Sequence, residues 1–310
     1  MFTTDAPLLV TGATGTVGRE VLRAALAAGH AVRALVPDPD GALDRLASVL
    51  PDGARHRAER RLQAARWDFL DRRALGDAVA GGTRLFLLRP PAIADVDGAI
   101  APAIDAALDA GVRHVAFLSI QGAERNRLVP HRAIEDHLRG CAARDPRVTW
   151  HFVRAAFFMQ NLLTAHGDEL RRESTLHIPA GDGRTAFVDA VDLGDAIVRL
   201  LAEPVPTSAA HECTGREALD YDEVVAILSR ALGRPIWYDA MGLVRFYRRR
   251  RAMGEPRALV GVMCALYTAT RLGLADRCTP DLERLLGRAP RTLAEFARDN
   301  AAAFAPASPA

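Results

Sequence analysis

Three glycines near the start of the chain, Gly12, Gly15 and Gly18, have a spacing that could bind a phosphate. They follow a short apolar run at residues 7–10 and precede an apolar-periodic segment at 21–26, so we predict a buried strand, a glycine turn and a helix. The first glycine allows a sharp reversal, the second lets backbone approach a phosphate, and the third lets helix and strand pack closely. The N–H groups that open the helix, at the positive end of its dipole, would then face an anion.

The spacing GxxGxxG is looser than the dinucleotide fingerprint GxGxxG. A tight turn that binds nothing is therefore the alternative. The context favours a dinucleotide, because a second strand is predicted at residues 31–36, directly after the helix.

The chain contains no lysine, so its basic side chains other than histidine are all arginines. This excludes Schiff-base chemistry, a Walker lysine and a lysine general acid. The cysteines show no C-x-x-C spacing and are expected to be reduced thiols: Cys141, Cys213, Cys264 and Cys278. His151, His177 and His211 are widely spread, so we assign no metal site.

Strand-like and helical patterns alternate through the first half of the chain. Further strands are predicted at 62–69, 83–88, 112–119 and 148–155, and helices at 42–50, 95–110 and 130–141. This alternation predicts an α/β fold, a Rossmann-like doubly wound parallel sheet with helices on both faces. The arginine-rich stretch 55–61 is read as a solvated connection or a basic binding patch.

Past residue 156 the alternation fades, and a smaller, mostly helical substrate lobe is predicted at 157–304. Helices are expected at 192–201, after an Asp220/Glu223 capping box as far as 232, and after a Thr292/Glu295 box to about 304. The nucleotide-binding domain is predicted to comprise residues 1–156, with a later strand and helix from about 185–202. The tail at 305–310 is expected to be disordered.

Bulk properties restrict the partners. With 310 residues, a quarter of them charged, and a formal net charge of +2, the chain is predicted to bind neither nucleic acid nor a membrane surface. No apolar run approaches the roughly 18 residues needed to span a bilayer, and we see no signal peptide. A cytoplasmic protein, monomeric or homodimeric, is expected.

Several sequence motifs identify a family resemblance: TGATGTVG at 11–18, WDFLD at 67–71, FLLRPP at 86–91, HVAFLS at 114–119, HRAIEDHL at 131–138 and FVRAAFFMQN at 152–161. Together they resemble the NmrA-like branch of the atypical short-chain dehydrogenases/reductases. The resemblance implies an NAD(P)H-dependent quinone, azo-dye or triphenylmethane-dye reductase. Some members are instead cofactor-sensing regulators.

The resemblance also implies cofactor contacts. The pyrophosphate would be held by Gly12, Thr14, Gly15, Thr16 and Val17. Asp68 and Phe69 would lie beside the adenine, unless Asp68 is a turn carboxylate. The nicotinamide and its ribose would be bordered by Leu88, Arg89, Pro90, Ser119, His131, Ala155, Ala156 and Phe157. Ser119 could instead be only a strand-end hydroxyl, and Phe157 a core residue.

The cofactor's 2′-position is left open. Family members that prefer NADPH commonly carry an arginine just after the second strand, where this chain has Pro37. Arg33 lies earlier in that strand. Asp38 could accept from a ribose diol, as in NAD binding, or stabilise its own turn. Of the two cofactors, our prediction leans slightly to NADP(H) over NAD(H).

The superfamily's usual Tyr-x-x-x-Lys pair is missing. When the helix at 130–141 is aligned on Glu135, the lysine position falls on His131 and the tyrosine position on Arg127. An arginine cannot give up a proton at any relevant pH. His131, with an ordinary pKa near neutrality, is the remaining titratable candidate, with Ser119 as a second catalytic candidate. Its alternative role is an i,i+4 partner of Glu135.

The segment 246–251, FYRRRR, is either a lid over an acidic or phenolic substrate or an amphipathic helix with a solvated basic face. The expected substrate pocket comprises Phe158, Asn161, Met241, Tyr247 and Tyr267. We predict hydride transfer to a small planar aromatic or quinone-like acceptor, which needs less protonation than a ketone does. A redox sensor without turnover, or a biosynthetic enzyme for dehydration, cyclisation or isomerisation, are the alternatives.

Overall fold

The computed structural model describes residues 6–48, 50, 60–71, 75–204 and 206–305. Most of the basic stretch 55–61, residue 49 of the predicted second helix and the tail beyond 305 lie outside these residues. The chain divides into two compact units. The first comprises Met1–Ala155, Ala190–Cys213 and Arg284–Gly287, and the second comprises Ala156–Asp189, Thr214–Glu283 and Arg288–Ala310.

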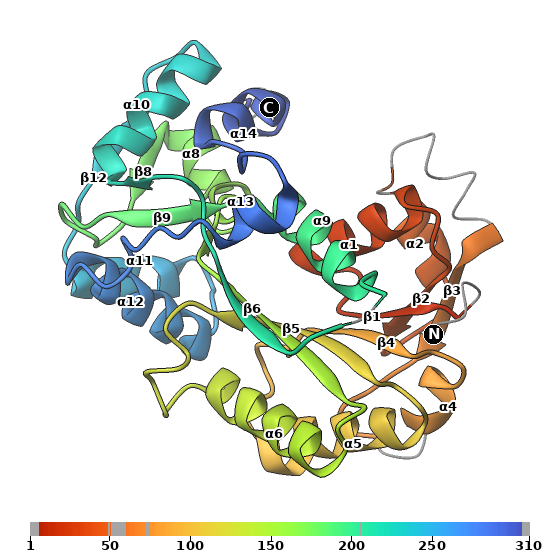
Figure 1. Cartoon of the computed structure of the whole chain (residues 1–310). Coiled ribbons are helices and arrows are strands. Elements are labelled where there is room, and N and C mark those ends of the chain that lie inside the picture. The colour runs from red at the N-terminus through yellow and green to blue at the C-terminus, as the bar shows by residue number, and fades with distance from the viewer. Residues whose placement is uncertain (1–5, 49, 51–59, 72–74, 205, 306–310) are drawn as a thin grey trace. The chain divides into compact units, whose positions relative to one another are not determined.

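The first unit is built on a sheet of seven parallel strands (Figure 1). In spatial order these are β10 (Ala209–Cys213), β6 (Thr149–Ala155), β5 (His114–Ile120), β4 (Arg84–Leu87), β1 (Leu8–Thr11), β2 (Val32–Val36) and β3 (Leu62–Arg66). The central strands are buried throughout, as parallel strands covered on both faces must be. The strand order reverses between β1 and β4, where open parallel sheets bind ligands beyond the carboxyl ends of their strands.

Helices cover both faces of this sheet (Figure 1). One face carries α1 (Thr16–Ala27), α2 (Ala42–Ser48) and α9 (Ala190–Leu201), and the other carries α4 (Leu75–Val79), α5 (Ala101–Asp109) and α6 (Pro130–Arg144). A π-helical turn, η1 (Val96–Ile100), leads into α5. Helices α1 and α9 approach closely at Gly194, where a Cβ would lie 2.6 Å from the carbonyl carbon of Glu20. The predicted Rossmann-like fold is confirmed.

The second unit has its own core and two small sheets. One sheet has the order β11 (Ala218–Leu219), β9 (Thr185–Val188), β7 (Phe157–Phe158), and the other pairs β12 (Trp237–Asp239) with β8 (Thr175–His177). The helices are α7 (Asn161–Thr164), α8 (Gly167–Glu173), α10 (Tyr221–Leu232), α11 (Leu243–Ala252), α12 (Arg257–Arg271), α14 (Leu293–Asp299) and the short η2 (Ala301–Phe304). Helix α13 (Asp281–Leu286) has residues in both units. Both predicted capping boxes are present, at α10 and α14.

One sequence expectation about the large sheet is wrong. The strand expected near residue 185 is β9, which pairs with β7 and β11 rather than with the seven-stranded sheet. The strand that follows β6 in the large sheet is β10, whose register places Ala209 beside His151. Strand β10 was missed because its sequence AAHEC has neither the alternation nor the continuous apolar run of a typical strand.

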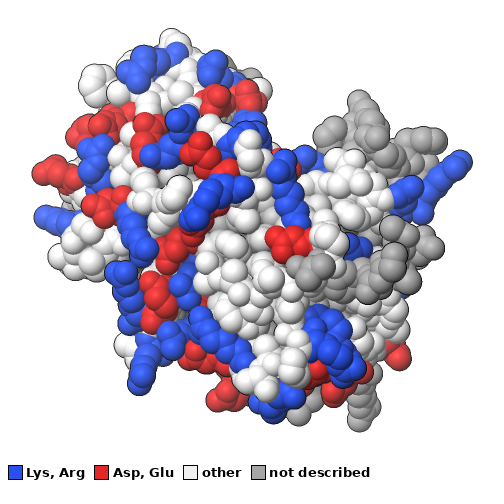
Figure 2. All heavy atoms as spheres, viewed as in Figure 1, with Lys and Arg blue, Asp and Glu red and all other residues white. Residues whose placement is uncertain are grey.

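Charged side chains are mixed on the surface. On the face drawn in Figure 2, arginines and acidic residues are interspersed over the described part of the chain. None of the helices that the structure describes is both long and apolar enough to cross a bilayer.

Candidate functional site

The glycine turn lies between β1 and α1, as predicted. Gly12 has φ of +61°, a backbone conformation that favours glycine, and the Gly15 amide donates to the Gly12 carbonyl at 2.9 Å. A Cβ on Gly18 would lie only 2.0 Å from the Gly12 oxygen. The turn therefore needs glycine at both ends, and Gly18 serves close packing of helix and strand.

The N-terminus of α1 is open to an anion. Its N-cap is Gly15, which offers no side-chain hydrogen bond, and the first turn, described in full, contains no acidic residue. The N–H groups of a first helical turn have no partner within the helix and carry the positive end of its dipole. A diphosphate fits this chemistry, and Thr14, Thr16 and Val17 are the residues that would hold it beside the glycines.

The ends of β1 and β4 are joined by a side chain. The Thr11 hydroxyl donates to the Phe86 carbonyl at 3.1 Å and accepts from the Leu88 amide at 2.7 Å. This places Leu88 against the turn, since a Cβ on Gly12 would lie 3.1 Å from a Leu88 methyl. The Arg89 guanidinium is used within its own loop, where it donates to the carbonyls of Pro90, Pro91 and Ile93.

A groove of about 610 Å³ opens beside the turn at the end of β2. Its lining comprises Thr14, Arg19, Val36, Pro37, Asp38, Arg45 and Leu46. Asp38 accepts from the Asp40 amide at 3.1 Å, so it does stabilise its own turn. Arg33 does not line this groove, because its guanidinium donates to the carbonyls of Ala78 and Ala80.

The adenine candidates form a turn after β3. Asp68 accepts from the Leu70 amide at 2.9 Å, as a turn carboxylate does. Phe69 is buried and packs edge-on against Trp67, with ring centroids 5.5 Å apart. Phe69 therefore belongs to the core, while Asp68 keeps a half-buried position beside it.

A buried ion pair lies where β5, β6 and α6 meet. Glu135 is fully buried and accepts two hydrogen bonds from Arg154, at 2.9 and 2.7 Å, and one from the Ser119 hydroxyl at 2.8 Å. Arg139 approaches the same carboxylate at 3.1 Å. Burial alone would raise the pKa of Glu135, but the hydrogen bonds from Arg154 and Ser119 outweigh it and hold the pKa below its ordinary value. Ser119 is thus more than a strand-end hydroxyl.

His131 stands on the first turn of α6 and stacks on Phe117, with ring centroids 5.9 Å apart. Burial and the positive charge of Arg89 lower the pKa of His131, and the negative charge of Glu135 raises it. The net effect is a pKa of about 4. The imidazole is therefore neutral at pH 7, with a pKa well below its ordinary value. The i,i+4 pairing with Glu135 is also not formed, because that carboxylate is taken by Arg154, Ser119 and Arg139.

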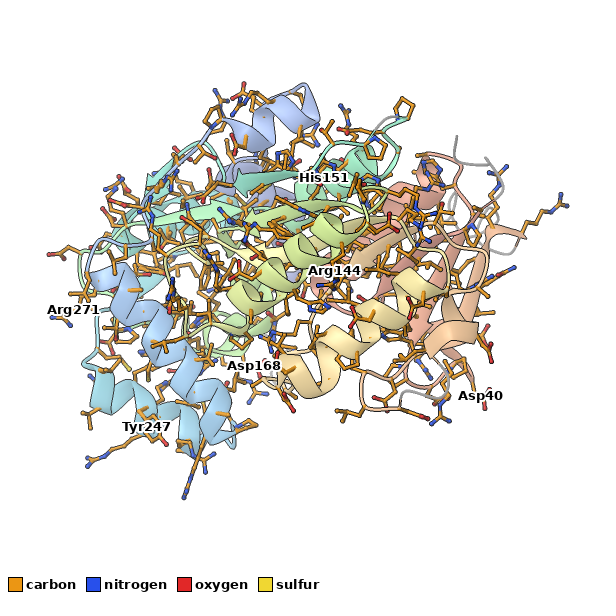
Figure 3. The ribbon with its side chains drawn as sticks, turned by 60° about the horizontal axis from the view of Figure 1, so that its bottom comes forward. Asp40, Arg144, His151, Asp168, Tyr247 and Arg271 are labelled. Carbon is orange, nitrogen blue, oxygen red and sulfur yellow. The ribbon has the colours of Figure 1, made fainter. Side chains whose placement is uncertain are left out.

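The second unit contains an apolar pocket of about 400 Å³. Three candidates line it: Phe157, Asn161 and Tyr267. Met241 is instead packed in the core, and Tyr247 is 38 % exposed on α11 (Figure 3), so neither lines the pocket. Phe158 lies next to Phe157 in β7 and is also outside the lining.

Tyr267 ends a chain of buried polar groups. Its hydroxyl is hydrogen-bonded to His166 Nε2, and His166 Nδ1 is hydrogen-bonded to Glu169. Burial raises the pKa of Tyr267 well above its ordinary value, so the phenol stays protonated. Arg250 also lines this pocket, and it is buried and paired with Glu255 at 2.8 Å.

The FYRRRR segment forms the amphipathic helix α11. Phe246 and Arg250, one turn apart, are buried, while Tyr247 and its arginine neighbours Arg245 and Arg248 are exposed. Arg250 does not belong to a solvated basic face, because its guanidinium donates to the Ala165 carbonyl at 2.7 Å.

Two of the histidines that look distant in the sequence are neighbours. His151, labelled in Figure 3, and His211 lie on the adjacent strands β6 and β10, with Nδ1 and Nε2 3.0 Å apart. His177 lies in the second unit and pairs with Asp239 and Glu173. The pairing of His151 and His211 was missed because it depends on strand order across 60 residues of sequence.

The seven-stranded order, the glycine turn and the open end of α1 define a Rossmann-like dinucleotide-binding protein. Comparison with known proteins gives the family. The NmrA-like family matches residues 4–297, and the chain belongs to that family. The resemblance to the NmrA-like branch is thereby confirmed.

Its relatives include reductases. The NAD(P)H azoreductase of Xenophilus azovorans is 32% identical over 298 residues, 96% of this chain and 99% of the relative. The quinone oxidoreductase 2 of Escherichia coli is 23% identical over 292 residues, 93% of this chain and 96% of the relative. The structure of the Citrobacter sp. triphenylmethane reductase with NADP(H) superposes with a TM-score of 0.77 at 22% identity, covering 95% of this chain and 99% of that one. The chain is an enzyme of the oxidoreductase class.

Proposed function

We propose that this protein is an NADPH-dependent reductase of planar aromatic or quinone-like acceptors. The observation that carries the proposal is the uncapped N-terminus of α1, reached through a turn that needs glycine at Gly12 and Gly18. The named activities of the relatives, on azo compounds and quinones, support this acceptor class. A nicotinamide cofactor bound at this turn would supply the hydride.

The groove beside the turn supports NADPH over NADH. It brings together Arg19 from α1 and Arg45 from α2, and two guanidinium groups suit a 2′-phosphate. Asp38 would favour NADH, because a carboxylate can accept from a ribose diol. Its carboxylate, however, already accepts a hydrogen bond from the Asp40 amide. We assign the 2′-phosphate contacts to Arg19 and Arg45, and leave Arg33 out.

Without a Tyr/Lys pair, the first unit offers other groups near the ends of β5 and β6. The Glu135–Arg154 pair fixes the Ser119 hydroxyl, and the neutral His131 can donate a hydrogen bond from one ring nitrogen. Neither group is a strong acid at pH 7. This arrangement suits an acceptor that delocalises the incoming charge, because such an acceptor needs little proton transfer in the hydride step.

We assign the acceptor to the pocket of the second unit. Its walls are aromatic and aliphatic, with Phe157, Tyr267, Leu259, Val262, Met263 and Leu266 among the lining residues. Asn161 and Arg250 add polar groups that could orient an oxygen or nitrogen of the acceptor. The Glu169–His166–Tyr267 chain holds the tyrosine ring in one orientation.

The test of turnover is oxidation of NADPH and NADH with a panel of quinones, azo dyes and triphenylmethane dyes. We expect turnover with members of this panel and a higher kcat/KM for NADPH. Tight binding of the cofactor without turnover on any acceptor would instead favour the sensor alternative, which the missing Tyr/Lys pair supports.

The test of cofactor choice is the dissociation constant of each cofactor for three variants. Arg19→Ala and Arg45→Ala should each weaken NADPH by roughly 10- to 100-fold, the value of one charge-assisted hydrogen bond, and leave NADH nearly unchanged. Arg33→Gln is the control and should bind both cofactors like the wild type. Equal losses for NADPH and NADH would contradict the assignment.

A further inference from the structure

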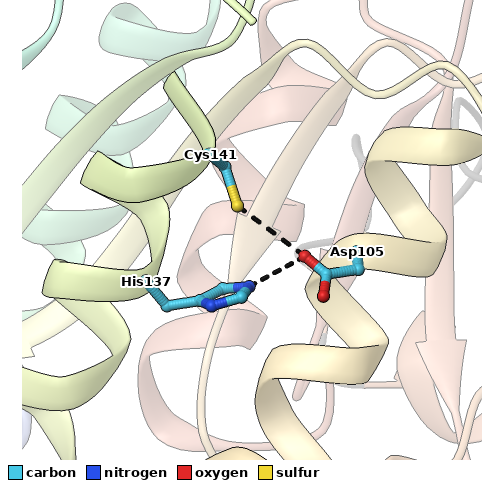
Figure 4. A group of neighbouring side chains, drawn as sticks. All are labelled: Asp105, His137 and Cys141. Carbon is cyan, nitrogen blue, oxygen red and sulfur yellow. Dashed lines mark hydrogen bonds and ion pairs between the residues drawn. The ribbon is translucent and has the colours of Figure 1, made fainter. Parts of the chain in front are cut away.

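Three side chains with metal-binding atoms converge between two helices of the first unit (Figure 4). Asp105 comes from α5, and His137 and Cys141 come from α6, one helical turn apart and so on the same face. The Asp105 Oδ1 atom lies 2.8 Å from His137 Nε2 and 3.7 Å from Cys141 Sγ. All three ligand atoms lie within 4.8 Å of one another.

One carboxylate oxygen, one imidazole nitrogen and one sulfur form a donor set that suits Zn²⁺. With ordinary zinc–ligand lengths, the ligand atoms of a tetrahedral site lie about 3.3–3.7 Å apart. The Sγ–Oδ1 distance already meets this requirement. The Nε2–Oδ1 distance must open by about half an ångström, which small rotations of the partly exposed Asp105 and His137 side chains allow.

The surroundings provide room for a fourth ligand and a partner for the sulfur. A polar cavity of about 490 Å³ is lined by Asp105 and Cys141 together with arginines and acidic residues, and it can supply a water molecule. The Arg144 guanidinium donates to Cys141 Sγ at 3.3 Å, but burial and the charge of Asp105 outweigh it and raise the pKa of the thiol, so a metal has to displace the thiol proton as it binds.

We propose that Asp105, His137 and Cys141 bind a Zn²⁺ ion, with water as the fourth ligand. The ion takes the place of the Asp105–His137 hydrogen bond and the thiol proton is released as the sulfur–metal bond forms. The site links α5 to α6, and α6 also carries Glu135, two residues before His137. It is separate from the glycine turn and does not depend on the proposed reductase activity.

The experiment uses the full chain after treatment with a chelator, titrated with Co²⁺ and then with Zn²⁺ in competition. We expect the near-ultraviolet thiolate-to-cobalt charge-transfer band, with visible bands of tetrahedral intensity, at one equivalent of Co²⁺, and displacement of both by Zn²⁺. Cys141→Ser should abolish the charge-transfer band. Asp105→Asn and His137→Gln should each weaken Zn²⁺ by at least about 10-fold, and Zn²⁺ should raise the melting temperature of the wild type.

The matched control is Cys278→Ser, which removes an exposed thiol of the second unit. It should keep the cobalt spectrum and the Zn²⁺ affinity of the wild type. Far-ultraviolet circular dichroism checks that every variant is folded. A charge-transfer band that survives in Cys141→Ser, or a wild type without that band, would overturn the proposal and leave Asp105 and His137 as a simple ion pair between helices.

Discussion

Replacing Glu135 with glutamine should cost the protein a large share of its stability. The carboxylate is fully buried and is bound by the two nitrogens of Arg154, whose side chain is itself only 8% exposed. Removing one partner of a buried ion pair typically costs about 3–5 kcal/mol. Glu124 at 3.2 Å and Glu212 at 3.7 Å still face Arg154, and glutamine keeps one acceptor, so we expect the loss to be about 2–4 kcal/mol.

The neighbouring residue on α6 provides the control. Asp136 pairs with Arg132 at 2.7 Å and Arg139 at 2.8 Å, but its side chain is 49% exposed. An exposed pair is worth about 0–1 kcal/mol, so Asp136→Asn should change the free energy of unfolding far less. Both variants remove one negative charge from the same helix and differ mainly in burial.

The assay is urea unfolding followed by tryptophan fluorescence and by circular dichroism, with the free energy extrapolated to water. Because the pKa of Glu135 is depressed in the folded state, its contribution is present above the unfolded pKa near 4.5 and is lost as the pH falls through the folded value. The difference between wild type and Glu135→Gln should therefore narrow in acid. Losses within about 0.5 kcal/mol of each other for the two variants at pH 7 would refute the reasoning.

Three further outcomes are expected. The Cβ of Gly18→Ala would lie 2.0 Å from the Gly12 oxygen, so this variant should lose cofactor binding in a fluorescence titration. The control Gly140→Ala on α6 should bind the cofactor normally, because its Cβ would meet only an arginine nitrogen at 3.5 Å. Burial lowers the pKa of His114 to about 4 and that of His151 to about 3. Below about pH 6.5 these histidines therefore take up protons in the unfolded chain but not in the folded protein. Each histidine should then lower the free energy of unfolding by up to about 1.4 kcal/mol per pH unit, down to its folded pKa. Urea unfolding at a series of pH values checks this, and a flat profile between pH 6.5 and 4.5 would contradict it. With its pKa at about 4, His131 should give the pH profile of kcat/KM no limb near pH 6.5. A limb there that vanishes in His131→Asn would show that the histidine titrates near its ordinary pKa and would contradict this prediction.

The sequence was informative where a feature depends on neighbouring residues. The β1–turn–α1 unit follows from glycine spacing and apolar periodicity over a dozen residues, and the capping boxes at Asp220 and Thr292 follow from contacts three residues apart. Strand β10 was missed because parallel strands may be adjacent at any sequence separation, and its pattern is weak.

The candidate site was predictable to a similar extent. The phosphate turn was found, but the arginines of the adjoining groove were not, since Arg45 reaches it only through the placement of α2. The pKa of His131 could not be foreseen, because it depends on burial against Phe117 and on Arg89. His137 and Cys141 have the right helical spacing for metal ligands, yet their third partner, Asp105, is supplied by another helix.

The division of the chain into interleaved stretches has a practical consequence for anyone who wishes to produce the cofactor-binding unit alone. A fragment that stops at Ala155 lacks α9, so the surface of α1 around Glu20 would be exposed to solvent. It also lacks β10, so β6 would become an unpaired edge strand of the sheet. Such a fragment should aggregate, which light scattering would reveal. During synthesis on the ribosome, the large sheet likewise cannot be completed until β10 has been made, and the first segment of the second unit is synthesised before β10.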